Sequence, residues 1–334
     1  MTAATQPLDM APDAFHAGEQ ALQARVGVRE RMAAAGPMLL RDHMPDQHRE
    51  LFEKLPTLLL AALDAAGQPW ATMVAGAPGF VHTPDMRRMQ INVQPGAADP
   101  VLARLASGSP VGVLGLEPHT RRRNRMNGRV AAFNNEGLAI DVVQSFGNCP
   151  KYIQAREPLA PSQALPPHPS APQPLGPALD AATLALLARS DTLFIASASA
   201  ARPGLARSDG VDISHRGGEP GFVQVAQTEQ GITLSMPDYP GNQFFNTLGN
   251  LAQHPLAGLL FVDYDSGGLL HVATETELMW DAAACAPWPG ALRVLRFKVL
   301  EGLWHPHALP LRWTAPVAAP QFRVMRERAA VTAL

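Results

Sequence analysis

Short apolar runs separated by turn-forming residues cover most of this chain of 334 residues. Runs such as TLLLAALDA from Thr57 and PVGVLGLE from Pro110 have the length of β-strands, and GAPG and NNEG are typical turn sequences. The pattern predicts two successive sets of antiparallel hairpins. The expected strands cover 57–65, 70–76, 89–93, 110–117, 128–134 and 138–145, then 192–199, 222–227, 231–236, 257–264, 269–278 and 292–304.

Helix-forming segments stand before and between these runs. The first has Asp13 as its N-terminal cap and Gly36-Pro37 as its stop signal. Asp99 is the expected cap of a helix between strands of the first half, and Asn242 is the expected cap of its equivalent in the second half. The expected helices cover 13–36, 45–55, 99–107, 178–190 and 243–254.

The two halves share a sequence motif. GAPGFV at 76–81 recurs as GEPGFV at 218–223, and each copy follows an apolar run that opens with Thr-Leu. A duplicated unit of this size predicts two like domains packed together rather than a solenoid. We therefore expect a first unit at 1–157, a proline-rich linker at 158–178 and a second unit at 179–334.

Composition narrows the function. Hydrophobic residues make up 46% and charged residues 17% of the chain, which is typical of a globular protein. The net charge of −2 argues against a nucleic-acid or anionic-membrane partner, and no apolar run approaches the roughly 20 residues that span a bilayer. Cys149 and Cys285 are too few for a disulfide framework or a cysteine-based zinc site. Because no secretory signal is visible, we expect a cytoplasmic protein.

A polar segment of the second half is a candidate anion site. Asp212, Ser214, His215 and Arg216 crowd into GVDISHRGGEPGFV, whereas the equivalent segment of the first half carries no charge. Arginine offers a planar set of donors to phosphate, and glycines such as Gly217 let backbone amides approach an anion. The alternative interpretation is a solvated hairpin turn.

Two further segments carry candidate residues. Asn242, Gln243, Asn246 and Thr247 lie where the turn PGN leads into a helix, whose free amides bind phosphate; simple capping is the alternative. The segment QSFGNCPKYIQAR at 144–156 follows the first unit and supplies Lys151 and Arg156 as cations and Phe146 and Tyr152 as flat surfaces.

Two other clusters allow more than one interpretation. The arginines of 121–129 are typical of a hairpin with solvated or ion-paired side chains, although one or two of them could line an anionic site. His16 and Glu19 lie on one helix face, which favours a capping or packing role over a metal site because no third ligand is in view.

The segments GVDISHRGGEPGFV, DYPGN and NTLGNLAQHPLAGLLFVD, together with FGNCPKYIQ, resemble the pyridoxamine 5′-phosphate oxidase-like family of FMN-binding split barrels. The resemblance implies a mainly β (α+β) fold of tandem antiparallel split β-barrels with short flanking helices, and FMN bound where the two barrels meet. The chain departs from the family at Gln243, where Arg or Lys is frequent, and at Asn246, where Asp is common.

Carried over residue by residue, the resemblance implies a cofactor site shared by both units. Its expected members are Ser197, Ser199, Asp212, Ser214, His215, Arg216, Gly217, Asn242, Gln243, Asn246, Phe146, Cys149, Lys151 and Tyr152. No residue is assigned a catalytic or metal-binding role.

We therefore predict an FMN-dependent oxidoreductase that acts on a small-molecule substrate, with NAD(P)H as a diffusing donor and about one FMN per chain. A homodimer is compatible with this prediction but not required by it. Two alternatives stay open. The first is a haem-binding or haem-degrading split barrel, with His215, His16 or His271 as candidate ligands, and the second is a flavin-binding protein without enzymatic activity.

Overall fold

The structure is a computed structural model that describes residues 14–96, 98–159 and 171–332. Its helices are α1 (Ala17–Arg25), α2 (Arg29–Leu39), α3 (Asp46–Lys54), α4 (Ala181–Arg189), α5 (Asn246–Gln253), α6 (Ala282–Cys285) and α7 (Pro320–Thr332), with a 3₁₀ turn η1 (Leu102–Arg104). The strands of the first half are β1 (Thr57–Leu63), β2 (Pro69–Ala75), β3 (Val81–Asp85), β4 (Arg88–Ile91), β5 (Pro110–Glu117), β6 (Arg122–Asn134) and β7 (Gly137–Gly147). Those that follow are β8 (Gln173–Gly176), β9 (Thr192–Ala198), β10 (Val211–Gly217), β11 (Gln224–Thr228), β12 (Gly231–Asp238), β13 (Leu256–Asp263), β14 (Gly268–Met279) and β15 (Arg293–His305).

The strands form two antiparallel sheets with the same topology. The first sheet has the order β2-β1-β5-β6-β7-β4-β3, and the second has the order β10-β9-β13-β14-β15-β12-β11, with β8 added beside β15. Each strand of the second order is numbered eight higher than the strand at the same place in the first, so the two orders are equivalent. The register repeats as well, since Leu59 pairs with Leu114 as Phe194 pairs with Leu260. The predicted fold class, mainly β with antiparallel sheets in tandem, is confirmed.

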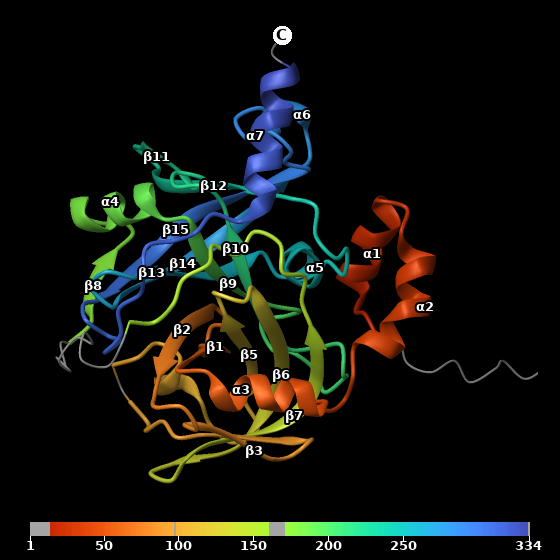
Figure 1. The fold of residues 1–334 in the computed structure, drawn as a ribbon, viewed down its shortest axis with the longest axis vertical. Coiled ribbons are helices and arrows are strands. Elements are labelled where there is room, and N and C mark those ends of the chain that lie inside the picture. Colours follow the sequence, from red (N-terminus) through yellow and green to blue (C-terminus); the bar gives the residue numbers. More distant parts are fainter. Residues whose placement is uncertain (1–13, 97, 160–170, 333–334) are drawn as a thin grey trace, which may run out of the picture.

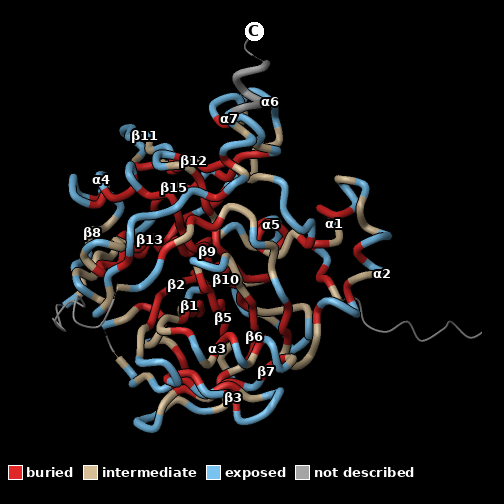
Figure 2. Tube along the Cα trace, in the orientation of Figure 1, coloured by how far each residue is buried: buried red, intermediate tan, exposed pale blue. Residues whose placement is uncertain are grey.

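The two sheets pack against each other along a shared core. Figure 1 shows the first unit below the second, and Figure 2 shows buried chain running through the strands where they meet. Glycines allow the close approach: a Cβ added to Gly112 would lie 2.7 Å from the carbonyl oxygen of Val211, and one added to Gly258 would lie 2.8 Å from the Cα of Trp70. Strand β5 therefore packs on β10, and β13 packs on β2, as two equivalent contacts.

Several helix predictions need correction. The single helix expected at 13–36 is two helices, because Gly27 has a φ of +72° and reverses the chain between α1 and α2. Gly36-Pro37 does not stop α2, which ends at Leu39, and Asp13 lies outside the described residues. The helix expected at 99–107 is reduced to the turn η1, although Asp99 does accept the backbone N–H groups that follow it.

The segment expected to link the two units has structure at its end. Residues 160–170 lie outside the described part of the chain, and β8, which follows them, pairs with β15. Bridges from Ala155 and Pro158 to Val317 and Trp313 tie the end of the first unit to the C-terminal segment. The predicted unit boundaries stay predictions. Among the described residues, no helix has the length and apolar character that crossing a membrane requires.

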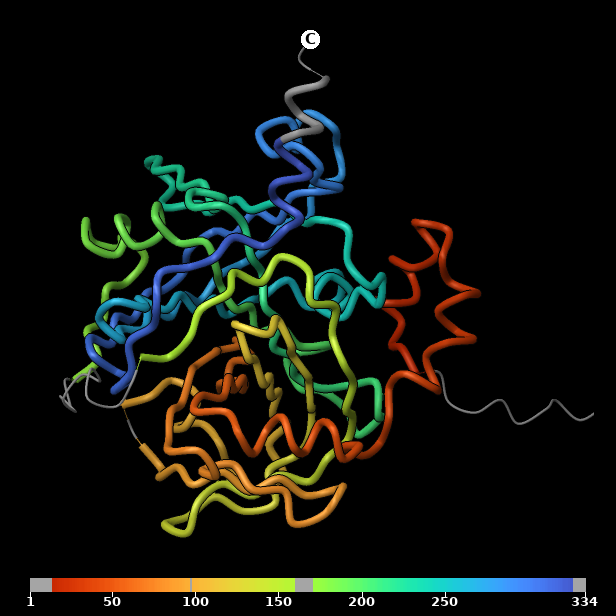
Figure 3. Tube along the Cα trace, viewed as in Figure 1, coloured from red at the N-terminus to blue at the C-terminus, as the bar shows by residue number. Residues whose placement is uncertain are grey.

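Helix α1 packs on α5 of the second unit, while Met32 of α2 shares a hydrophobic cluster with Phe146 of β7 and with Phe244, which precedes α5. Figure 3 shows α1 and α2, in red, beside the blue-green helix α5 of the second unit. Helix α3 covers the first sheet through the buried residue Phe52, which packs in the core of that sheet. The N-terminal segment therefore joins the two units at α5.

Candidate functional site

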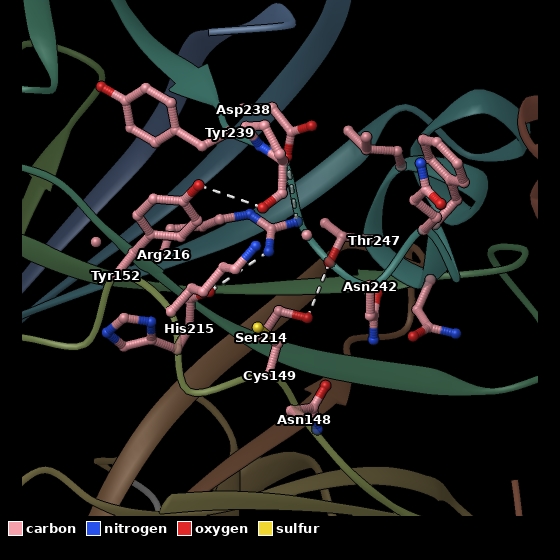
Figure 4. A pocket seen from close by; sticks show the side chains of 18 of the residues that line it. Asn148, Cys149, Tyr152, Ser214, His215, Arg216, Asp238, Tyr239, Asn242 and Thr247 are labelled. Atoms are coloured by element: carbon pink, nitrogen blue, oxygen red, sulfur yellow. Dashed lines mark hydrogen bonds and ion pairs between the residues drawn. The ribbon is translucent and has the colours of Figure 1, made fainter. Parts of the chain in front are cut away.

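A cavity of about 200 Å³ lies between the two units. The first unit lines it with β6 and with the segment 148–152 that follows β7, while the second unit lines it with β10, the turn 237–243 and the start of α5. Figure 4 shows Ser214, His215 and Arg216 on one strand, beside Cys149 and Tyr152. The cavity is therefore built from segments far apart in the sequence.

A buried polar network forms one side of the cavity. Arg125, which is 3% exposed, donates to Asp212 at 3.0 Å and also to the Ser214 hydroxyl. Asp212 accepts further bonds from Asn127 at 2.5 Å and Asn250 at 3.1 Å. The carboxylate of Asp212, which accepts from several donors, therefore balances the positive charge of Arg125 in a buried place where water does not solvate that charge.

The opposite side has more donors than acceptors. Two guanidinium groups share the carboxylate of Asp238: Arg293 lies 3.1 Å from it and Arg216 lies 4.0 Å from it. The Nε atom of Arg216 and the Nη1 atom of Arg293 are buried without a hydrogen-bond partner among the described residues. Burial lowers the pKa of Arg216 and raises that of Asp238. This wall therefore has spare donors for an anionic group.

The charges around the cavity do not balance. Five cationic side chains line it, which are Arg123, Arg125, Lys151, Arg216 and Arg293. Against them stand two carboxylates, Asp238 in the lining and Asp212 behind it, so three positive charges remain uncompensated. Burial, reinforced by Arg216, lowers the pKa of Arg123 to about 9, which leaves its guanidinium protonated at neutral pH. A site with this surplus favours an anion.

His215 is a neutral group of this site. Burial, with Arg123 and Arg216 nearby, holds the pKa of His215 well below its usual range. Its Nδ1 lies 3.0 Å from Nη1 of Arg123, and because a guanidinium only donates, Nδ1 must accept. The proton of the neutral ring is therefore on Nε2.

Strained backbone gathers at the cavity. Tyr152, Gln243 and Phe245 each have a φ of 66°, and they are three of the six non-glycine residues with positive φ in the described part of the chain. Such conformations are unfavourable by about 1–3 kcal/mol each and cluster at functional sites. Phe245 is also the N-cap of α5, so the prediction of Asn242 as the cap is wrong. The side chain of Asn242 instead accepts from the Phe244 N–H.

Helix α1 holds the α5 side of the cavity in place. A Cβ on Gly18 would overlap the backbone of Gly249, so the two helices touch directly. Glu19 of α1 accepts from the Asn246 side chain at 2.5 Å. Burial, reinforced by Asp212, raises the pKa of Glu19 to about 8. Glu19 is therefore protonated at neutral pH.

Aromatic rings line one end of the cavity. The rings of Tyr152 and Tyr239 stack with centroids 5.2 Å apart, and the Tyr152 hydroxyl donates to the carbonyl of Pro240 at 3.2 Å. Burial raises the pKa of both tyrosines to about 12, so both stay protonated. This end offers flat apolar surface next to the cationic wall.

The structure brings together ten of the fourteen residues expected at the site. These ten line the cavity: Ser214, His215, Arg216, Gly217, Asn242, Gln243, Asn246, Cys149, Lys151 and Tyr152. Their role in binding a cofactor stays a prediction.

The other four expected residues do not line the cavity. Ser197 and Asp212 lie behind it in the buried network, where both accept from Asn250. Phe146 packs against Phe244 with ring centroids 6.0 Å apart. Ser199 follows the end of β9 and accepts from the Gly210 N–H, because the chain turns away there toward the loop before β10.

The sequence interpretation did not single out several lining residues. Asp238, Tyr239, Arg293 and Asn148 were not predicted, and Arg123 and Arg125 were covered only by the general allowance for the arginine cluster. Residues 123, 125 and 127 share one face of β6, but the sequence alone gives no signal for them, because residues 122 and 124 on the other face are polar as well.

The three candidate haem ligands lie in different places. His215 lines the cavity, but the lone pair of its Nδ1 already accepts a hydrogen bond from Arg123. His16 and Glu19 form a capping box at the start of α1, and the Nδ1–H group of His271 donates to the Ala71 carbonyl, 2.8 Å away, inside the core. Among the described residues, no group of three or more His, Cys, Asp or Glu side chains is arranged to hold a metal ion.

Comparison with known proteins gives distant structural matches. No protein-family profile and no curated protein matches the chain. HupZ of Group A Streptococcus matches with 12% identity and a TM-score of 0.27, over 36% of this chain and 90% of HupZ. HutZ, the haem storage protein of Vibrio cholerae, matches with 10% identity and a TM-score of 0.26, over 39% of this chain and 95% of HutZ.

A third solved structure is similar to the same extent. It is a Clostridium acetobutylicum protein of the pyridoxinephosphate oxidase family related to general stress protein 26, with 13% identity and a TM-score of 0.25, over 40% of this chain and 91% of that one. At these identities and TM-scores, the matches carry no conclusion about what this chain binds.

Proposed function

We propose that the cavity binds FMN and that the chain is an FMN-dependent oxidoreductase, with NAD(P)H as the electron donor and a small molecule as the acceptor. The observation that carries the proposal is the positive surplus of the cavity together with the unpartnered Nε of Arg216. A phosphate group would satisfy both at once, because it brings negative charge and several acceptors to donors that are already buried.

The residues present fit the other parts of FMN as well. The first turn of α5 lines the cavity and adds free backbone amides for the phosphate. Tyr152 and Tyr239 would contact the ring system. The cavity volume of about 200 Å³ is below the roughly 300–1,000 Å³ of pockets that enclose a drug-sized ligand, so FMN would be only partly enclosed and open to a diffusing partner.

The chain would bind and orient the cofactor rather than carry out the redox step. FMN supplies hydride and electron transfer when it is bound. Arg216, Arg123 and Lys151 would hold the phosphate, and Arg125 stays paired with Asp212. His215 would remain neutral and offer a proton at Nε2 as a hydrogen-bond donor.

The absorbance spectrum of the purified protein tests the proposal. Flavin bands, with the flavin identified as FMN after release, are the expected result, and a Soret band would instead support the haem alternative. Anaerobic bleaching of the bound flavin by NADH or NADPH is expected of an enzyme. A flavin that neither donor bleaches would make the chain a flavin binder.

Arg216→Ala tests the phosphate contact directly. We expect it to weaken FMN binding about tenfold or more, since hydrogen bonds to charged groups contribute about 1.5–3 kcal/mol. Arg296→Ala is the matched control, because Arg296 is exposed on β15 and pairs with Glu277. Equal FMN retention in both variants would remove Arg216 from the phosphate site.

A further inference from the structure

A second cavity lies next to the first, in the second unit. Its volume is about 250 Å³, and four segments line it: residues 219–224 between β10 and the start of β11, Tyr239 after β12, the loop 287–289 after α6, and the first half of α7. Figure 1 shows α6 and α7 side by side at the end of the molecule where this cavity lies. We call this cavity the α7 groove.

The lining of the α7 groove is mostly apolar and aromatic. Eight of its twelve residues are aromatic, proline or methionine side chains: Pro220, Phe222, Tyr239, Pro287, Trp288, Pro289, Phe322 and Met325. The Trp288 indole N–H donates to the carbonyl of Phe222 at 3.0 Å, which fixes the ring in place. A fixed aromatic wall is a preformed surface on which a flat molecule can stack.

The charge of the α7 groove is balanced, unlike that of the first cavity. Its two charged residues, Glu219 and Arg326, form an ion pair at the exposed rim. An anionic ligand would therefore find no free cation there among the described residues. The lining fits an uncharged molecule better than a phosphate or a carboxylate.

The volume sets the size of the occupant. A cavity of about 150 Å³ holds benzene, so 250 Å³ has room for about two fused rings. It cannot enclose a dinucleotide, which is larger than the drug-sized ligands of roughly 300–1,000 Å³ pockets.

Tyr239 belongs to the lining of both cavities. Its ring stacks on Tyr152 of the first cavity and contacts Phe322 of the α7 groove, with centroids 6.3 Å apart. Phe322 also lies 5.7 Å from Tyr152. A layer of three aromatic rings therefore separates the two cavities.

We infer that the α7 groove is a second small-molecule site that takes a planar, uncharged, two-ring aromatic compound, bound on the other side of this aromatic layer from the cationic cavity. The inference rests on the lining of the groove itself and does not require that FMN occupies the first cavity.

Equilibrium dialysis with 2-naphthol tests the inference, with 2-naphthalenesulfonate as the charged ligand of equal ring size. We expect saturable binding of one 2-naphthol per chain at the α7 groove. Because the cationic cavity can hold an anion, only the binding that is lost when the groove is filled is compared, and there we expect the sulfonate to bind at least tenfold more weakly. Absence of saturable 2-naphthol binding would overturn the inference, and tighter binding of the sulfonate at the groove would overturn the assigned ligand class.

Met325→Trp locates the site by filling the groove. We expect it to weaken 2-naphthol binding at least tenfold, while Val324→Trp, on an exposed position of the same helix, leaves binding unchanged. Gln224→Trp fills the groove from an exposed position of β11 and serves if Met325→Trp does not fold. Unchanged binding in a folded groove-filling variant would contradict the inference.

FMN binding by the same variants separates the two proposals. FMN affinity should be unchanged in Gln224→Trp, because Gln224 does not belong to the lining of the first cavity. Failure of FMN to bind the wild-type chain would contradict the proposed function and would leave the 2-naphthol result standing on its own.

Discussion

Strand β10 packs on β5 at the cationic cavity, and β2 packs on β13 at an equivalent contact elsewhere in the molecule. The strand register shows which residues of the two contacts are equivalent. Ser214, His215 and Arg216 of β10 correspond to Thr72, Met73 and Val74 of β2, since each trio pairs with the same positions of the neighbouring strand. In the same way, Arg123, Arg125 and Asn127 of β6 correspond to Leu269, His271 and Ala273 of β14. We call the interface that holds these residues of β2 and β14 the counterpart interface.

The counterpart interface is filled where the cavity is open. Met73, Leu269 and Ala273 are all buried in hydrophobic clusters. Its polar side chains bond to nearby groups: Thr72 donates to Asp99 at 2.5 Å, and Nδ1 of His271 donates to the Ala71 carbonyl at 2.8 Å, while Nε2 of His271 is buried without a partner among the described residues. The same backbone thus supports a dry core at one contact and a charged cavity at the other. The fold therefore does not require the charges of the cavity, which favours a binding role for them.

The largest expected effect comes from breaking the charge network behind the cavity. Asp212→Ala leaves Arg125 buried without its carboxylate, and we expect the free energy of unfolding to fall by about 3–5 kcal/mol. Urea denaturation measures it. Asp141→Ala is the control, because Asp141 pairs with Arg88 at an exposed position where such pairs contribute about 0–1 kcal/mol. Equal losses in the two variants would mean that the network is not buried in solution.

The next effect comes from turning the cavity into its counterpart. The triple variant Ser214→Thr, His215→Met and Arg216→Val gives β10 the residues that β2 carries at the same positions. We expect FMN affinity to fall about 100-fold, equivalent to about 2.7 kcal/mol, with the fold retained. Calorimetric titration and the thermal unfolding temperature measure the two quantities.

The matched control changes the same positions of the counterpart interface. Thr72→Ser combined with Met73→Leu keeps polarity and volume on β2, and we expect unchanged FMN affinity. If the β2 variant lost as much affinity as the β10 variant, the two interfaces would not differ in function.

The smallest expected effect concerns the helix that docks on the cavity side. The folded protein holds a proton on Glu19 up to about pH 8, whereas the unfolded chain releases it near pH 4.5. The contribution of protonated Glu19 to the free energy of unfolding is therefore complete below pH 4.5 and is lost as the pH rises toward 8. Between pH 7 and pH 8 we expect the free energy of unfolding to fall by about 1 kcal/mol from this group.

Glu19→Gln tests this pH dependence, because glutamine cannot ionise. Asp212 and Arg125 are the charged groups that face Glu19, and both remain in the variant. The slope of stability between pH 7 and pH 8 should be smaller in the variant than in the wild type. Identical slopes would show that Glu19 is ionised at neutral pH.

The sequence predicted the strands better than the helices, for a physical reason. Most apolar runs became strands close to their expected bounds, because hairpin pairing and burial act on the same residues that form the runs. The helix breaks depended on single backbone angles, such as the positive φ of Gly27 and of Phe245. Phe245 has no sequence feature that predicts a left-handed conformation, so the start of α5 was placed at Asn242.

The candidate site was predictable only where its residues lie in one motif. Ser214, His215 and Arg216 are neighbours in sequence, so their segment was found directly. Arg293 and Asp238 reach the cavity because β12 pairs with β15, a contact between distant segments. The repeat indicated which half supplies the charged strand. The segment before the motif is charged only in the second copy, and the structure shows the same difference between β10 and β2.

Calorimetric titration of the same protein with FMN and with riboflavin measures the contribution of the phosphate site, because the two ligands differ only in the phosphate. We expect one FMN per chain and riboflavin binding weaker by about 100-fold, with Arg216→Ala reducing the difference between the two. Equal affinity for FMN and riboflavin would contradict this expectation, because the surplus positive charge of the cavity would then have no part in binding.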